Sequence, residues 1–245
     1  MLARLIVNPD AGVREEIISE HHTCVVIDDF LQNPGEVVSY AAARRDIFEV
    51  PQRSYPGVVM DIEADPMADI YRFLRTRMSR FFDFFRGGVK MSTILSMTTL
   101  RPHELSNLQR ICHVDPGSGI DRRNFASVLY LFENPLLGGT AFYRWKDRKA
   151  VEEATALDLE DSQTALQFLK SKFDYYNEAP RYFTTSNEVA ELLAMVPAKF
   201  NRLIFYSGDL PHNAWIDRPD LLSTNPETGR LTLNCFLSVK PRPDQ

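Results

Sequence analysis

Apolar residues recur along this chain in two rhythms, one helical and one typical of strands. Apolar side chains three and four positions apart predict a helix from Met67 to Phe85 with one buried face, and an earlier helix is expected from Pro34 to Ala43. Residues 92–100 are apolar or β-branched, which is typical of a strand. Further strands are expected near residues 109–115, 124–133, 139–145, 200–206, 212–216 and 230–239.

This order of elements predicts a mainly β protein with added helices. The expected core is a double-sheet jelly roll, also called a double-stranded β-helix, with a helical N-terminal buttress. Val25–Leu31, followed by Gln32-Asn33-Pro34, resembles the segment in which a strand runs into the first helix in a family of enzymes considered below. The chain has no Gly/Ser-rich or Pro-rich linker, so residues 1–245 are expected to form a single domain.

An insertion of about fifty residues, 146–198, interrupts the β pattern. Its acidic first part leads into a helix expected at Thr164–Phe173, and Thr185 with Glu188 forms a capping-box pattern that predicts a second helix through Leu193. The stretch between them is rich in aromatic residues. Two interpretations stay open: the insertion packs its aromatics on the core or on a dimer partner, or it is a lid that shapes a substrate pocket.

Composition and charge limit the classes of substrate and the cellular location that are expected for this protein. The net charge is -5 and no Lys/Arg-rich block occurs, which argues against nucleic-acid binding and favours a small-molecule or protein substrate. The three cysteines are widely spaced, unlike a disulfide framework, and indicate a reducing compartment. With no signal peptide pattern and no apolar run of membrane length, the protein is expected to be cytoplasmic and without a membrane partner.

The strongest candidate for chemistry is the triplet His113-Val114-Asp115. Successive side chains of a strand point to opposite faces, so His113 and Asp115 project from the same face and can hold one metal ion. His212 lies on a later expected strand and is the candidate third ligand. Two imidazoles and a carboxylate on one octahedral face suit Fe(II) and leave three positions open. Asp209, nearby in a Ser-Gly-Asp-Leu-Pro turn, is interpreted as a turn residue.

These residues, in this order, resemble the Fe(II)- and 2-oxoglutarate-dependent oxygenases, and within them the prolyl-hydroxylase-like group. Arg230 lies 18 residues (230 − 212) after His212 and opens an apolar strand, as does the basic residue that binds the far carboxylate of 2-oxoglutarate in that family. Thr232, on the same strand face, matches an assisting hydroxyl. Tyr130, ahead of the Gly138-Gly139 pair, matches a tyrosine that contacts the co-substrate. The resemblance covers about residues 25–239.

The resemblance implies a metal site of His113, Asp115 and His212, a co-substrate site of Arg230, Tyr130 and Thr232, and dioxygen as the oxidant. It implies hydroxylation of a C–H bond with release of succinate and carbon dioxide. Asp115 argues against the family's halogenases, which replace this carboxylate, and Phe236 stands where its nucleic-acid demethylases carry a second arginine. The alternative is a catalytically silent jelly-roll protein that binds a metal or ligand, or that serves assembly. The substrate and a homodimer stay open.

Overall fold

The computed structural model describes residues 1–51, 55–83, 85–115 and 122–241. Within them the chain is mainly β, with antiparallel sheets and four α-helices. The strands are β1 Gly12–Ser19, β2 His22–Asp28, β3 Gly57–Asp61, β4 Phe85–Thr98, β5 Arg123–Tyr130, β6 Gly139–Trp145, β7 Ala190–Pro197, β8 Leu203–Ser207, β9 His212–Trp215 and β10 Arg230–Lys240. The helices are α1 Pro34–Ala42, α2 Ala68–Arg77, α3 Arg148–Glu160 and α4 Ser162–Lys172.

The larger sheet has seven strands in the described part of the chain, in the order β1-β2-β8-β5-β10-β4-β3. Every neighbouring pair in it is antiparallel. In β10, Thr232 lies opposite Tyr130 of β5 on one side and Ser96 of β4 on the other. Strands β4, β5, β8 and β10 confirm the expected strands at these positions, whereas β1 and β3 were not expected.

The smaller sheet has the order β7-β6-β9 within the described residues. His113 joins its edge through a single antiparallel bridge to His212 of β9. The expectation of a strand at 109–115 is therefore wrong: Leu108–Arg110 is a 3-10 turn. In this turn the Arg110 carbonyl oxygen accepts a hydrogen bond from the Tyr175 hydroxyl, at 2.8 Å, and not from a neighbouring strand.

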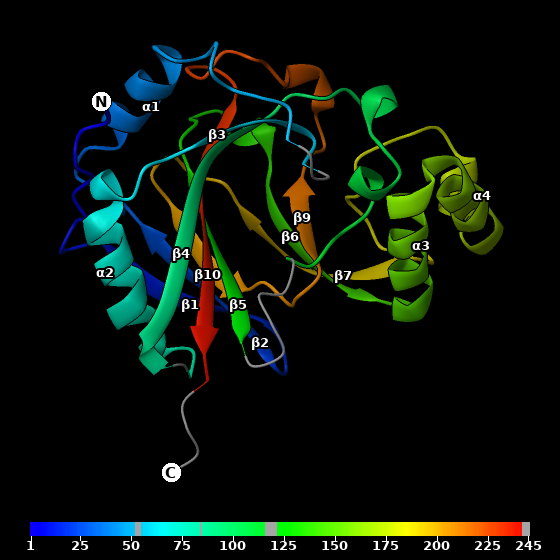
Figure 1. The fold of residues 1–245 in the computed structure, drawn as a ribbon, viewed down its shortest axis with the longest axis horizontal. Helices are drawn as coiled ribbons and strands as arrows, with labels where there is room; N and C mark the ends of the chain where they lie inside the picture. The colour runs from blue at the N-terminus through cyan, green and yellow to red at the C-terminus, as the bar shows by residue number, and fades with distance from the viewer. Residues whose placement is uncertain (52–54, 84, 116–121, 242–245) are drawn as a thin grey trace.

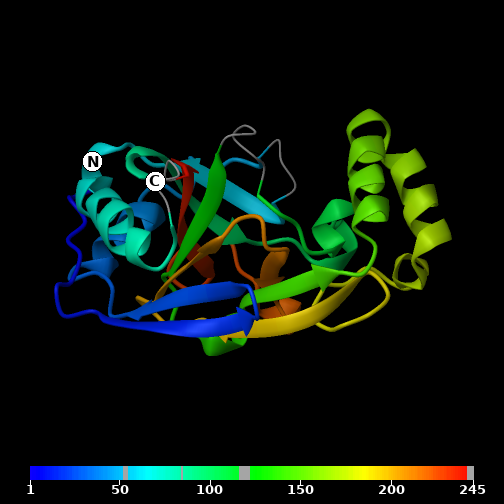
Figure 2. The same ribbon diagram turned by 90° about the horizontal axis from the view of Figure 1, so that it is seen from below.

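The two sheets and the helices form layers. Helices α1 and α2 cover one face of the larger sheet through a buried cluster that includes Val37, Leu74 and Leu233. The smaller sheet covers the other face through a second cluster, which includes Tyr130 and Phe142. A third cluster lies on the outer face of the smaller sheet, where α3 and α4 pack. Figures 1 and 2 both show α2 and the α3–α4 pair at opposite ends of the molecule.

The helix expected over residues 67–85 is shorter than predicted. Met67 belongs to a 3-10 turn, α2 spans Ala68–Arg77, and a second 3-10 turn covers Met78–Arg80. Phe85 opens β4 and is not part of the helix. The periodicity could not mark this end, because the apolar residues continue at helical spacing into the turn while the chain reverses toward the sheet.

The insertion contains two helices, but one of the two expected positions is wrong. Helix α4 confirms the helix expected at 164–173, and the acidic first part is itself helical as α3. The capping-box helix does not form, since residues 190–197 pair with β6 as strand β7. The Glu188 carboxylate instead accepts from the Tyr175 backbone N–H at 2.6 Å. Tertiary pairing therefore overrides the helical tendency of Glu191-Leu-Leu-Ala-Met.

Two further observations concern the cysteines and the length of the helices. All three cysteines are buried and free, as expected for a chain without a disulfide framework. Among the described residues, no helix is long and apolar enough to cross a membrane.

Candidate metal centre

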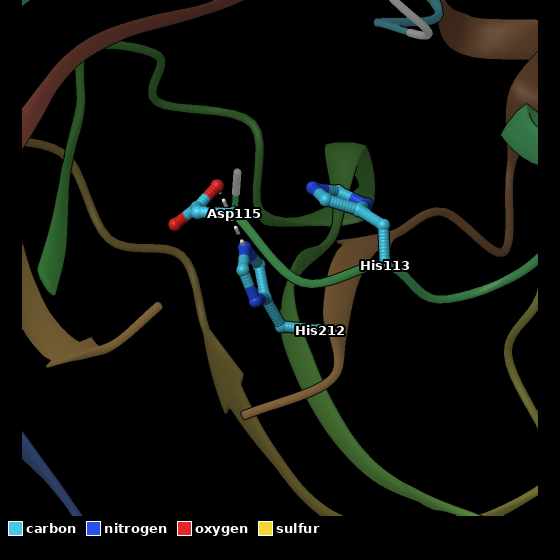
Figure 3. A group of neighbouring side chains, drawn as sticks. All are labelled: His113, Asp115 and His212. Atoms are coloured by element: carbon cyan, nitrogen blue, oxygen red, sulfur yellow. Dashed lines mark ion pairs between the residues drawn. The ribbon is translucent and has the colours of Figure 1, made fainter. Parts of the chain in front are cut away.

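Three side chains from two separate segments converge on one space. His113 and His212 exchange two backbone hydrogen bonds, from His113 N to His212 O at 3.0 Å and from His212 N to His113 O at 2.8 Å. Asp115 N donates to Gly208 O at 2.9 Å. One candidate ligand atom from each of His113, Asp115 and His212 lies within 4.8 Å of the others. Figure 3 shows the three side chains gathered from the two segments. The spacing predicted for His113 and Asp115 thus holds locally, although a bridge replaces the expected strand.

His212 is held in a fixed orientation. Its Nδ1 lies 2.8 Å from the Leu210 carbonyl oxygen, which assigns the N–H to Nδ1 and leaves the Nε2 lone pair free. Nε2 lies 3.8 Å from Asp115 Oδ1 (Figure 3). Burial lowers the pKa of His212 to about 4, so the ring is neutral near pH 7. A neutral imidazole with its second nitrogen bonded to a carbonyl is the form in which histidine ligates metals.

Asp115 is a buried carboxylate with one oxygen, Oδ2, that lacks a hydrogen-bond partner among the described residues. Burial, with a smaller contribution from Asp209, raises the pKa of Asp115 to about 6. An unpaired carboxylate oxygen in the interior is costly, and a dication beside it would offset that cost. The donor set of two imidazoles and one carboxylate therefore fits a transition-metal ion such as Fe(II).

Gly208 makes room for this carboxylate. A Cβ on Gly208 would lie 2.8 Å from Asp115 Oδ2 and 3.1 Å from Asp115 Cβ. The first distance is shorter than those that Cβ atoms make to other atoms in proteins. The glycine backbone meanwhile bonds on both sides, from Gly208 N to Asn124 O at 2.9 Å and from Asp115 N to Gly208 O. The glycine thus cannot easily move away, and only the carboxylate can.

We expect Gly208→Ala to weaken Fe(II) binding by roughly 10- to 100-fold while the protein remains folded, because the added methyl group turns the Asp115 carboxylate out of position. A competition titration against a metal chelator measures the affinity, and circular dichroism checks the fold. Gly12→Ala is the matched control, since a Cβ on Gly12 meets nothing within 4 Å. Unchanged Fe(II) affinity in Gly208→Ala would show that the carboxylate position does not matter to the site.

The predicted co-substrate residues lie on the face of the larger sheet that is turned toward the smaller sheet. Arg230 is buried, and its Nε and Nη2 donate to the carbonyl oxygens of Leu137 at 3.1 Å and Gly139 at 2.8 Å. Its Nη1 lies 3.4 Å from the Thr98 hydroxyl oxygen. None of the ion pairs found among the described residues involves Arg230. The guanidinium is thus a buried cation that links the two sheets without a carboxylate.

Tyr130 and Thr232 lie next to each other across β5 and β10. The Tyr130 hydroxyl lies 2.7 Å from the Thr140 hydroxyl, and the Thr232 hydroxyl lies 2.9 Å from that of Ser96. Asn234 adds a donor to Ser96 Oγ at 2.6 Å. The structure therefore brings these residues into one buried polar layer, and each hydroxyl already has a protein partner.

Sequence reasoning missed two residues of this region, Gly208 and Tyr206. The Tyr206 ring meets the His212 ring edge to face, with centroids 4.8 Å apart. Tyr206 belongs to the same buried cluster as Tyr130. The strand expected at 200–206 and its two-residue alternation could have indicated Tyr206, since Ile204, Tyr206 and position 208 share a face. Nothing in the sequence could indicate the contact of Gly208 with Asp115.

The insertion contacts both segments that carry the candidate ligands, from the outer side of the smaller sheet. Tyr175 donates its hydroxyl to the carbonyl oxygen of Arg110, three residues before His113. The Phe183 carbonyl accepts from Asn213 Nδ2 at 2.8 Å, next to His212. The aromatics of the joining stretch are all buried: Phe173, Tyr175, Tyr176, Tyr182 and Phe183. This burial supports the interpretation that the insertion packs its aromatics on the core.

The fold and the site together define a mainly β protein with a candidate mononuclear metal centre of two histidines and one aspartate. The chain belongs to DUF6445, a family of unknown function whose model matches residues 9–237. No curated protein matches the sequence.

Solved structures similar to this chain include two that are described as hydroxylases. A prolyl-4-hydroxylase from Pseudomonas putida has 15% identity and a TM-score of 0.45, over 91% of this chain and 95% of that one. The viral collagen prolyl hydroxylase of Paramecium Bursaria Chlorella virus-1 has 10% identity and a TM-score of 0.43, over 88% and 96%. HygX from Streptomyces hygroscopicus, solved with nickel and 2-oxoglutarate bound, has 14% identity and a TM-score of 0.45, over 89% and 82%.

Proposed function

We propose that this protein is an Fe(II)- and 2-oxoglutarate-dependent oxygenase that hydroxylates a C–H bond of its substrate. The observation that carries the proposal is the buried Asp115 carboxylate, whose Oδ2 has no partner among the described residues, placed beside His212 and His113. Two neutral nitrogen donors and one carboxylate on one side of an ion leave positions open on the other. That is the arrangement a metal needs to bind small ligands.

His113, Asp115 and His212 would hold the metal, and Arg230 would hold the far carboxylate of 2-oxoglutarate, with the Tyr130 and Thr232 hydroxyls beside it. When bound, Fe(II) and 2-oxoglutarate supply the oxidation of a C–H bond by dioxygen, with succinate and carbon dioxide released. The buried Arg230 cation lacks an ion-pair partner among the described residues, so an anionic ligand would complete it. In a water-poor interior such a pair binds and orients its ligand firmly.

The strand order supports a double-stranded β-helix core, which we include in the proposal. From β4 onward the chain alternates between the sheets: β4 in the larger, His113 bridged to the smaller, β5 in the larger, β6 and β7 in the smaller, β8 in the larger, β9 in the smaller and β10 in the larger. This alternation is expected of a double-sheet jelly roll. We also propose that residues 1–245 form one domain, because the buried clusters connect the strands of both sheets.

The substrate is proposed to be a small molecule or a protein or peptide, not nucleic acid. His113 is exposed whereas His212 and Asp115 are buried, so the centre opens to solvent on the His113 side. Substrate would approach from that side, opposite the polar layer around Arg230. A net charge of -5 does not favour a polyanion at this opening.

We expect the purified protein, supplied with Fe(II), dioxygen and 2-oxoglutarate, to form succinate even without its substrate. Succinate formation is measured by mass spectrometry, with Asp115→Asn as the control that keeps the shape but lacks the anionic ligand. If wild-type protein binds Fe(II) and 2-oxoglutarate yet forms no more succinate than Asp115→Asn, the protein is a catalytically silent binding module.

A further inference from the structure

Tyr206 is a buried tyrosine whose hydroxyl has no partner among the described residues. The side chain is 2% exposed, and its hydroxyl forms no hydrogen bond with any residue that the structure describes. The other buried tyrosines of the described chain all have one, to a threonine hydroxyl or to backbone carbonyls: Tyr130, Tyr143, Tyr175, Tyr176 and Tyr182. A phenol on a buried ring normally finds an acceptor in the protein or in water. The Tyr206 hydroxyl is not among the polar atoms that are wholly buried without a partner, so its oxygen is accessible to water or to a ligand.

The Tyr206 ring is fixed next to the candidate metal centre. Its centroid lies 4.8 Å from that of His212, at an interplanar angle of 68°, and 4.9 Å from that of Phe142, at 76°. Position 208, two residues further on, projects from the same side of the chain and lies against Asp115 Oδ2. Two metal-ligating side chains, Asp115 and His212, therefore border the space that this ring faces.

Tyr206 also lies between the centre and the polar layer of the larger sheet. It shares a buried cluster with Tyr130, which lies opposite Thr232 in the sheet register. The Tyr130 hydroxyl lies 2.7 Å from that of Thr140, whereas the Tyr206 hydroxyl has no partner among the residues that the structure describes. Of these two phenols, Tyr206 is thus the one that is free to donate to a ligand.

We propose that the Tyr206 hydroxyl donates a hydrogen bond to the metal-bound end of a 2-oxo acid, and so positions that co-substrate between the metal centre and Arg230. This inference rests on the proposed function and adds a contact at the end opposite to the far carboxylate. A carboxylate or keto oxygen is the acceptor that the phenol lacks, and an O–H···O⁻ bond is among the stronger hydrogen bonds in proteins. Tyr206 acts here as a positioning residue and takes part in no proton transfer.

The test is Tyr206→Phe, which removes only the hydroxyl. We expect the affinity for 2-oxoglutarate to fall about tenfold, as for the loss of one hydrogen bond to a charged group. The affinity for Fe(II) should stay within about twofold, since the ring packing on His212 is kept. Without ligands, the Tm should stay close to that of wild type, because the substitution removes no hydrogen bond to a described residue. Anaerobic titration of 2-oxoglutarate into Fe(II)-loaded protein, followed by charge-transfer absorption, gives the affinity.

Tyr143→Phe is the matched control. Its hydroxyl donates to the Phe183 carbonyl at 2.8 Å on the outer side of the smaller sheet, so this variant should have a lower Tm and an unchanged affinity for 2-oxoglutarate. A wild-type protein that binds no 2-oxoglutarate would contradict the proposed function itself. Equal affinity in wild type and Tyr206→Phe would overturn the inference alone. So would a fall in Tm or in Fe(II) affinity, because the hydroxyl would then act within the protein.

Discussion

Replacing His113, Asp115 or His212 by alanine is expected to abolish stoichiometric Fe(II) binding while the protein stays folded. One candidate ligand atom from each lies within 4.8 Å of the others, so each substitution would remove one of the three proposed metal ligands. We expect affinity to fall by more than about 100-fold, beyond the loss seen when only a supporting contact is removed. The fold should survive, since the buried apolar clusters of both sheets contain none of the three residues. Iron stoichiometry and circular dichroism measure the two effects.

Substitutions of Asp115 and His212 should affect the stability of the metal-free protein differently, which makes the result easier to interpret. Asp115→Asn removes a buried, partly unpaired charge and should leave the Tm of the metal-free protein unchanged or higher. His212→Ala empties the space beside the Tyr206 ring and should lower the Tm, so His212→Asn is a useful second variant. His103→Ala, at an exposed residue, is the control that should keep its iron. Full iron occupancy in His212→Ala would remove that residue from the centre.

Much of the β core was predictable because its pattern is local. Strands β4, β5, β6, β8, β9 and β10 match expected positions, since apolar and β-branched runs bounded by turns suffice to mark a strand. The order of those strands was not predictable, because pairing joins residues as far apart as Ser96 and Thr232. The helix predicted from Thr185 and Glu188 failed for the same reason, since pairing with β6 outweighed a local capping pattern.

In the candidate site, too, features set by local sequence pattern were predictable and features set by tertiary contacts were not. The convergence of His113 and Asp115 needed only the alternation of neighbouring residues, and it holds although the expected strand is reduced to one bridge. His212 could be matched only through the family resemblance, because its distance from His113 depends on the whole fold. The roles of Gly208 and Tyr206 were not predictable, because they follow from contacts with Asp115 and His212 that only tertiary packing creates.

Arg230→Ala is expected to weaken 2-oxoglutarate binding by roughly 2 to 5 kcal/mol, because a desolvated carboxylate would lose its buried cation. Arg230→Lys keeps the charge but loses the planar fork, and should cost less. Iron affinity should barely change in either variant. The bonds of the guanidinium to the Leu137 and Gly139 carbonyls add a second effect. Their loss leaves buried acceptors unpaired, so Arg230→Ala should also lower stability, by about 1 to 3 kcal/mol for each acceptor.

The stability effect calls for a control that separates it from ligand binding. Arg202 serves, since its guanidinium bonds Asp28 Oδ1 at 2.6 Å and the Pro197 carbonyl at 2.8 Å, and neither partner is a predicted co-substrate residue. Arg202→Ala should lower the Tm and leave the affinity for 2-oxoglutarate unchanged. Titration of anaerobic Fe(II)-loaded protein, followed by charge-transfer absorption, compares the variants. Equal affinity in wild type and Arg230→Ala would mean that another cation binds the co-substrate. Two other candidates are Arg144, which pairs with Glu191, and Lys199, which pairs with Asp29. Both are exposed, and either would have to break its ion pair to bind the co-substrate.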